Sequence, residues 1–471
     1  MTGRSCNVAA VVAAVGVLGA PAEVSANGRF PAAQQLVVSP SDPDRIAVQV
    51  TYGFLESFDR GATFSWTCEE AALYSGEFDP PIALLSGSTL IAGTPDGVVH
   101  DAQDACSFAA GAGLEGHFIA DVSASRAQLA GAIAMSVDQA GAAEFDTRLW
   151  TTSDGGLTWA ALGGPLATDF RGLTVDAAPS DEAILYVSGL RVSSDGTGKG
   201  QLAVSGDNGD TWAYYPVPTS NELAAPYIGA ISPTDPNSVW VRLAGNGGLL
   251  YRTRNGAVGF ERVFDGLGPL LALALSPDGS TVVVGGEVDG LLSADTTEAV
   301  FSPVSSVPAR CATWTSEGLY VCADEGKAGF TLGLSTDGGA TLTPLYRQGC
   351  LTGPTVCETP LEACEARWTS QSQLLGSCEQ QGDGGAGGAG TSEPPTDDVT
   401  SGCSFSRGSV RPPRFALPPT CSPSEARGTS TPVGRANASP SCSTAKDRER
   451  STSSGTGAIL LVLLLRRRAR R

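Results

Sequence analysis

The chain has 471 residues and a formal net charge of −19, with 49 aspartates and glutamates against 30 lysines and arginines. This acidic balance argues against nucleic acid as a partner, because phosphate backbones attract basic surfaces. The 59 glycines and 30 prolines indicate many turns but fall short of disorder throughout, and the length is compatible with one large repeat domain plus appendages.

The first 26 residues have the pattern of a secretory signal peptide. Arg4 provides a basic start, Val8 to Leu18 are apolar, and Val24-Ser25-Ala26 is a small-residue cleavage site, with Ala22 as an alternative. Export is the expected consequence, and the 12 cysteines fit a compartment where disulfides persist. Removal of Cys6 with the signal leaves an odd number of cysteines, so one thiol is left over.

An eight-residue pattern recurs through the first three quarters of the chain, in the order hydroxyl, any, Asp, any, Gly, any, Thr, large apolar. Its four good copies are SFDRGATF from Ser57, TSDGGLTW from Thr152, SGDNGDTW from Ser205 and STDGGATL from Ser335. Weaker copies occupy residues 101–108, 253–260 and 293–300. The Asp-equivalent positions are 44, 51, 53, 48, 40 and 42 residues apart, a period that suits one four-stranded propeller blade.

Between these copies the chain alternates short β-rich runs with turns of Gly, Pro, Asp and Ser. Ile228 to Ser232, for example, precedes a PTDPN turn and the run from Val239 to Leu243. Residues 34–347 show no amphipathic helical period of useful length. The sequence therefore predicts an all-β, seven-bladed β-propeller over residues 27–347, with six blades as the alternative.

Each copy is expected to stabilise the hairpin that joins the third and fourth strands of its blade. Asp and Ser or Thr side chains can bond the amides of a tight turn, Gly takes backbone angles that other residues resist, and the aromatic residue packs between sheets. The positions to which we give this structural role are Ser57, Asp59, Gly61, Thr63, Asp154, Gly156, Thr158, Trp159, Ser205, Asp207, Gly209, Thr211, Trp212, Ser335, Asp337, Gly339 and Thr341.

These segments resemble the Asp-box (BNR) repeat of sialidases, sortilin-type receptors, xyloglucan hydrolases and photosystem assembly factors. The resemblance covers about residues 34–347 and implies a propeller whose boxes lie on the outer rim, away from the central channel. It does not imply one chemistry, because the same box occurs in enzymes and in non-enzymes.

The cysteines of this region are expected to form disulfides. Cys311 and Cys322 flank a predicted hairpin centred on Ser316-Glu317 and fall opposite each other, within disulfide distance. Cys68 follows the first box and Cys106 lies in the second, so a bridge between neighbouring blades is predicted.

A Cys-rich closing segment, residues 348–379, follows the last box. For its cysteines a disulfide knot is preferred to a zinc site, because only two histidines occur and export is predicted. These cysteines are Cys350, Cys357, Cys364 and Cys378.

The rest of the chain has the composition of a stalk and a tail. Residues 380–456 are rich in Gly, Ser and Pro and form a predicted linker. Residues 457–471 combine an apolar run, too short to span a bilayer, with a terminal arginine cluster. This ending resembles the C-terminal sorting tails of myxobacterial surface proteins, and the resemblance makes Cys403 the candidate lipid attachment site. The stretch between Cys403 and the apolar run is longer than in those tails.

No catalytic constellation is evident in the sequence. A phosphate-binding loop and a GxSxG elbow are absent, and neither His100 nor His117 lies in a triad motif. Arg171, Arg242 and Arg310 show no pattern that would mark the arginine triad of sialidases, whose Phe-Arg-Ile-Pro element is also absent. We expect no cofactor and no metal.

The favoured interpretation is an exported, monomeric binding or scaffolding module for a protein or glycan ligand. It would be secreted or held at the cell surface or outer membrane through its C-terminal tail. The alternative is a glycoside hydrolase, sialidase-like or xyloglucan hydrolase-like, which rests on fold analogy alone.

Overall fold

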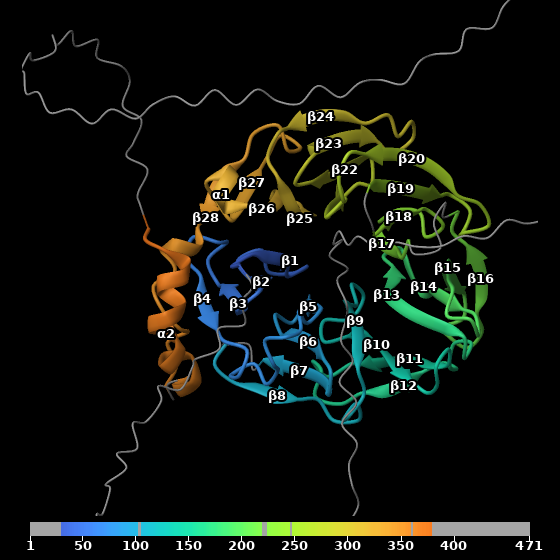
Figure 1. Ribbon diagram of the computed structural model, residues 1–471, viewed down its shortest axis with the longest axis horizontal. Coiled ribbons are helices and arrows are strands. Elements are labelled where there is room, and N and C mark those ends of the chain that lie inside the picture. The colour runs from blue at the N-terminus through green and yellow to red at the C-terminus, as the bar shows by residue number, and fades with distance from the viewer. Residues whose placement is uncertain (1–29, 102–104, 219–223, 245–246, 359–360, 379–471) are drawn as a thin grey trace, which may run out of the picture. The chain divides into compact units, whose positions relative to one another are not determined.

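The computed structural model describes residues 30–101, 105–218, 224–244, 247–358 and 361–378. In these ranges, 28 strands form seven four-stranded antiparallel sheets, arranged as blades around a central channel (Figure 1). The prediction of an all-β, seven-bladed β-propeller is confirmed, and the six-bladed alternative is wrong. The predicted signal peptide, stalk, sorting tail and Cys403 lie outside the described residues.

The strands follow one another in chain order through the blades. Blades 1 and 2 contain β1 (Ala33–Val38), β2 (Ile46–Val50), β3 (Gly53–Ser57), β4 (Ser65–Thr67), β5 (Ile82–Leu84), β6 (Leu90–Thr94), β7 (Gly97–Asp101) and β8 (Phe108–Ala110). Blades 3 and 4 contain β9 (Ile119–Ala124), β10 (Ala132–Gln139), β11 (Phe145–Thr152), β12 (Ala160–Leu162), β13 (Phe170–Ala178), β14 (Asp181–Val192), β15 (Gly198–Ser205) and β16 (Ala213–Pro216). Blades 5 and 6 contain β17 (Pro226–Ile231), β18 (Val239–Leu243), β19 (Gly248–Thr253), β20 (Glu261–Gly266), β21 (Ala272–Leu275), β22 (Thr281–Gly286), β23 (Gly290–Asp295) and β24 (Ser302–Ser305). Blade 7 contains β25 (Ala309–Thr315), β26 (Gly318–Ala323), the single helical turn α1 (Glu325–Ala328), β27 (Leu332–Ser335) and β28 (Thr343–Tyr346).

Each blade consists of four consecutive strands, with the first beside the channel and the fourth at the rim (Figure 1). Within the described ranges, no strand of blade 7 joins the sheet of blade 1. Each blade is a separate sheet, and blades 7 and 1 are in addition the one neighbouring pair of described blades that consecutive strands do not connect.

Apolar side chains between neighbouring sheets form the core. Tyr186 and Leu202 of blade 4 share one buried cluster with Val239 of blade 5. A second cluster joins Tyr320 of blade 7 to Trp66 of blade 1. Because a single four-stranded sheet exposes both faces, burial against the next blade supplies most of its stability.

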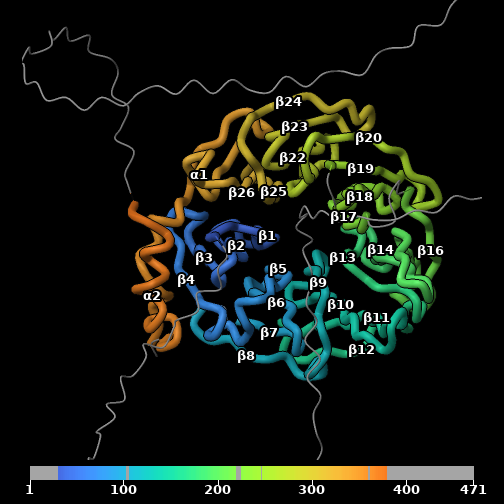
Figure 2. The backbone as a smooth tube through the Cα atoms, in the orientation of Figure 1, coloured from blue at the N-terminus to red at the C-terminus, as the bar shows by residue number. Residues whose placement is uncertain are grey.

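After β28 the chain runs along the outside of blade 1, as the tube in Figure 2 shows. We call this segment the strap; it comprises residues 348–358 and 361–378, with the 3₁₀ turn η1 (Gln348–Cys350) and the helix α2 (Glu362–Leu375). Helix α2 was not predicted from the sequence, because the apolar residues of EACEARWTSQSQLL form no stripe along one face.

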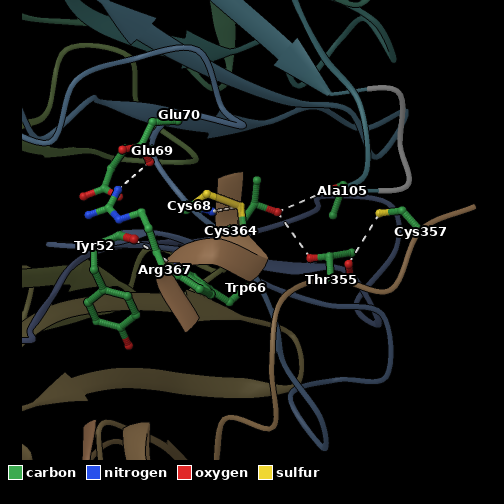
Figure 3. Close-up of a disulfide and its surroundings, with 11 residues drawn as sticks. Tyr52, Trp66, Cys68, Glu69, Glu70, Ala105, Thr355, Cys357, Cys364 and Arg367 are labelled. Carbon is green, nitrogen blue, oxygen red and sulfur yellow. Dashed lines mark hydrogen bonds and ion pairs between the residues drawn. A yellow bond between two sulfur atoms is a disulfide. The ribbon is translucent and has the colours of Figure 1, made fainter. Parts of the chain in front are cut away.

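The strap is held against blade 1 by several kinds of contact (Figure 3). The amide of Thr355 donates to the carbonyl of Trp66 at 2.8 Å, and Trp66 packs on Trp368 with ring centroids 5.8 Å apart. Arg367 of α2 forms ion pairs with Glu69, at 2.7 Å, and with Glu70. Tertiary contacts of this kind stabilise a helix that its own sequence pattern would not predict.

Two disulfides fasten the strap to the propeller, and they correct the predicted bridge between Cys68 and Cys106. Cys68 is bonded to Cys364 of α2, and Cys106 is bonded to Cys357. The prediction was wrong because it considered only neighbouring blades, whereas the strap lies along the outer wall and brings its own cysteines to both sites.

The remaining bridges join Cys311 to Cys322 and Cys350 to Cys378. Cys311 and Cys322 are directly opposed across β25 and β26, and Thr315 pairs with Gly318 around the turn at Ser316-Glu317. All four cysteines of the closing segment are in disulfides, which excludes the zinc alternative at these positions. No helix in the described part of the chain is long and apolar enough to cross a membrane.

Candidate functional site

The four good boxes each lie between the third and fourth strands of a blade. In the last one, Ser335 Oγ and the Thr341 amide donate to Asp337 Oδ1 at 2.7 and 2.9 Å, and Thr341 Oγ1 donates to Oδ2 at 2.6 Å. The Thr341 hydroxyl, followed by its amide and Ser335, lowers the pKa of Asp337 to about 2. The same bonds recur around Asp59, Asp154 and Asp207. Both carboxylate oxygens are thus engaged within the turn.

The glycine of each good box takes a left-handed backbone conformation. Gly61, Gly156, Gly209 and Gly339 have φ between 86° and 100°, a region that side chains with a Cβ rarely enter. The box aromatic Trp159 is buried, and its indole N–H donates to the Gly156 carbonyl at 3.1 Å. These residues therefore stabilise the turn of the hairpin that joins the third and fourth strands.

The mouth of the central channel is built from the first strand of every blade. An open cavity of about 920 Å³ is lined by residues of all seven first strands and of the turns that follow them in every blade except blade 2. Because the strands of a blade alternate in direction, the boxes open on the same face of the ring as this mouth, but at its rim.

Proline residues occupy the turns around the mouth. Pro40, Pro43, Pro179, Pro233 and Pro277 line the cavity from the first turns of four blades. A proline fixes φ and reduces the conformational freedom of the turn. The rim is therefore preorganised, which lowers the entropy cost of binding a ligand there.

Side chains satisfy the exposed edges of the first strands by bonding across to the next blade. The Gln35 amide exchanges two hydrogen bonds with the backbone of Ile82, each 2.9 Å long. Asp121 accepts from the Val175 amide at 2.8 Å, and Thr313 Oγ1 donates to the Leu36 carbonyl at 2.8 Å. These bonds pair edge groups that would otherwise stay unsatisfied.

Blades 3 and 4 place two carboxylates beside the channel. Asp176 on β13 accepts from Ser123 Oγ on β9 at 3.0 Å, and it lines the cavity. Burial among protein atoms raises the pKa of Asp176 to about 6, although Ser123 and Arg126 oppose the shift. Burial, together with the charge of Asp176, also raises the pKa of Asp121 well above its usual value. Both residues are nevertheless only half-buried, and Asp176 is in contact with the channel cavity.

A second cavity, of about 470 Å³, lies between blades 3 and 4. It shares Ser123, Ala124, Ala177 and Glu182 with the channel cavity, so the two are continuous in their lining. Glu182 joins the blades by accepting from Ser125 Oγ and from the Arg126 and Ala127 amides, at 2.6, 2.5 and 3.0 Å. The site therefore extends outward from the channel along one joint between blades.

The other side chains considered in the sequence have separate contacts. His100 is buried on β7. His117 Nδ1 is 2.6 Å from Asp138 Oδ2, and its ring packs against Trp150 with the two ring planes tilted by 46°. Arg242 donates to the Leu270 carbonyl at 3.2 Å. Arg310 forms a 2.7 Å ion pair with Glu287.

Asp121, Asp176 and Glu182 were not among the candidate residues predicted from the sequence. Asp121 is in the middle of β9, Asp176 is near the end of β13, and Glu182 follows the first turn of blade 4. No box or motif marks any of the three, and Asp121 and Asp176 do not occupy equivalent positions in their blades: Asp121 corresponds to Thr174, which accepts in the same way from the first strand of the next blade.

Fold and site together define the class of this protein: a seven-bladed β-propeller with a ligand-sized cavity at one end of its channel. No protein-family model and no curated protein matches the chain. Among solved structures, an ancestral GH74 enzyme is 14% identical with a TM-score of 0.47, and the match covers 67% of this chain and 49% of that one, about half of its length. YCF48 from Cyanidioschyzon merolae is 15% identical with a TM-score of 0.42, covering 62% of this chain and 93% of that one. A structure described as YCF48 bound to D1 peptide is 18% identical with a TM-score of 0.32, covering 48% and 66%.

Proposed function

We propose that this protein is an exported binding module that holds a segment of a protein or glycan ligand at the mouth of its channel. The continuous cavity formed by the channel mouth and the joint between blades 3 and 4 carries the proposal. Four disulfides among the described residues favour an oxidising, extracellular environment. The structural boxes are at the rim, so the mouth is left for recognition.

The decisive experiment is a binding screen of the purified, disulfide-bonded chain on peptide and glycan arrays. Ala124→Trp, at a half-buried position that lines both cavities, should weaken binding by about tenfold or more, because the indole fills the site. Ala140→Trp is the matched control, since Ala140 is exposed on the turn after β10, on the opposite face. Binding that persists in Ala124→Trp would place the ligand elsewhere.

A surface anchor completes this proposal, and it rests on the tail resemblance. The mature protein is expected to lack Arg466 to Arg471 and to carry a lipid on Cys403. Mass spectrometry of the mature C-terminus in the native host tests this expectation. An intact terminal peptide from Thr456 onward would contradict processing, and an unmodified Cys403 in a processed chain would contradict the attachment site.

A glycoside hydrolase is the second candidate, and the Asp121–Asp176 pair favours it. Asp176 lines the channel cavity, Asp121 lies close to it, and both have raised pKa values; coupled carboxylates with perturbed pKa values are a recurring feature of acid–base sites. Turnover of sialosides or β-glucans that disappears in Asp176→Asn would establish the hydrolase and displace the pure binding module.

A further inference from the structure

Asp176 lines the channel cavity, and among the described residues only one of its two carboxylate oxygens accepts a hydrogen bond. Ser123 bonds only Oδ1, and no other hydrogen bond or ion pair to Asp176 is found among the described residues. Asp176 lines the cavity and is partly accessible from it. A carboxylate in this position is able to accept a charged donor from a ligand.

The neighbouring charged groups are already engaged or lie too far away to neutralise it. Asp121 accepts from the amides of Val122 and Val175, at 3.0 and 2.8 Å. Glu182 is occupied by the turn after β9. Arg126 is exposed and acts on Asp176 only through its field. The local balance at the joint of blades 3 and 4 is therefore negative.

The shape of the site suits an extended chain rather than a small ion. The channel cavity and the cavity between the blades meet at Ser123 and Ala177, on either side of the joint, and Asp176 lies at that junction. Across the channel, Trp314 of blade 7 lines the same cavity. The face of an aromatic ring attracts cations, so Trp314 is a second group in the cavity that favours a cationic ligand.

We propose that this site binds an extended basic peptide segment, whose Lys or Arg side chain pairs with Asp176 while the peptide backbone follows the cavity between blades 3 and 4. The proposal rests on the proposed binding function and specifies its ligand. A neutral glycan fits the same volume but leaves the carboxylate unpaired. The net charge of −19 adds long-range attraction for a basic partner.

The test begins with selection of ligands on the full, disulfide-bonded chain from a randomised short-peptide library. Selected peptides should contain Lys or Arg, and replacing that residue by Gln should weaken binding by about tenfold or more. Asp176→Asn on the protein should cause a similar loss while it retains the bond from Ser123 Oγ. Asp195→Asn is the matched control, because it removes the same charge from an exposed turn on the opposite face.

The outcomes distinguish a failure of the basic-peptide proposal from a failure of the proposed binding function at the channel mouth. Peptides that are neutral or acidic, or that bind Asp176→Asn as tightly as the wild type, overturn the basic-peptide assignment, even if Ala124→Trp still abolishes binding. Peptides that bind Ala124→Trp unchanged overturn the channel-mouth function itself. Thermal unfolding of each variant shows whether a lost affinity reflects a lost fold, and Asp176→Glu, which keeps the charge, should retain most of the binding.

Discussion

The joint between blades 7 and 1 and the joint between blades 3 and 4 are built in different ways. At the first, an apolar cluster, the strap and two disulfides hold together blades that no loop connects directly. At the second, the chain passes from β12 to β13, and the contacts include Ser123 with Asp176 and Glu182 with the turn after β9. Because a loop connects blades 3 and 4 and limits their separation, their interface can contain polar groups and a cavity. No loop connects blades 7 and 1, and there disulfide bonds take the place of the chain connection.

The separation of the bonded cysteines explains the importance of the first joint. Cys68 and Cys364 are 296 residues apart, and Cys106 and Cys357 are 251 residues apart. Each bridge therefore restricts nearly the whole propeller in the unfolded chain, and in the chain-entropy description such long loops contribute most to stability.

The largest expected effect is the loss of both strap disulfides. Replacing either cysteine pair by alanine should lower the free energy of unfolding by about 2–4 kcal/mol. Replacing both pairs should lower it by about 1–2 kcal/mol more than the sum of the two separate losses. The reason is that either bridge alone still closes the ring, so the second then closes only a short loop. Denaturant unfolding of the two double variants and the quadruple variant measures the difference. Strict additivity would show that the bridges act independently and not as ring closures.

Glu182 provides the corresponding test at the joint of blades 3 and 4. Glu182→Ala removes three hydrogen bonds that cross the joint and should cost about 2 kcal/mol. Glu182→Gln, which keeps one acceptor oxygen, should retain part of the stability that Glu182→Ala loses. If both variants unfold like the wild type in denaturant, the joint does not depend on this side chain.

The pH dependence of stability should have opposite signs for the channel and the rim. The pKa of Asp176 is raised to about 6, so its contribution is fully present below the unfolded value of about 3.9 and is lost as the pH rises through about 6. The pKa of Asp337 is lowered to about 2, so its contribution is present above the unfolded value and is lost as the pH falls through about 2.

Unfolding midpoints measured against pH would separate the two contributions. Asp176→Asn should reduce the fall in stability between mildly acidic and neutral pH and leave the acid limb unchanged. Asp337→Asn should affect only the acid limb. A neutral-side slope that is the same in Asp176→Asn and the wild type would contradict the burial of this carboxylate.

The smallest effect is expected for an exposed ion pair at the joint of blades 7 and 1. Arg60 lies 3.3 Å from Glu317, with 55% and 36% of the two side chains exposed. Solvent and salt screen such a pair, so Glu317→Gln, which leaves the ion pair of Arg60 with Asp44 intact, should leave the unfolding midpoint unchanged within error. A clear loss would mean that the joint depends on surface charge as well as on its disulfides.

The local features of this fold could be predicted from the sequence, because they depend on residues close together in the chain. The spacing of the boxes indicates the blade period, Val239–Leu243 is a strand with the predicted bounds, and the hairpin numbering places Cys311 opposite Cys322. In each case a turn and its flanking strands carry the information.

The contacts that close the ring and build the site could not be predicted in the same way. Cys68 meets Cys364 only after the whole ring has formed, and α2 depends on blade 1 for its stability. Asp121 and Asp176 are brought together by the packing of two blades, and the separation of 55 residues between them has no local signature. Pairings of this kind require knowledge of the fold.

The strap also determines how the propeller would respond to mechanical force. Tension on the chain beyond Cys378 passes through the bridge to Cys350 beside blade 7, and along α2 through Cys364 to Cys68 on blade 1. Cys357 carries part of the same load to blade 2. Because the force is distributed over blades 7, 1 and 2, it is not concentrated on the outermost strand β28. A propeller tethered by its C-terminal end would then resist the separation of single strands.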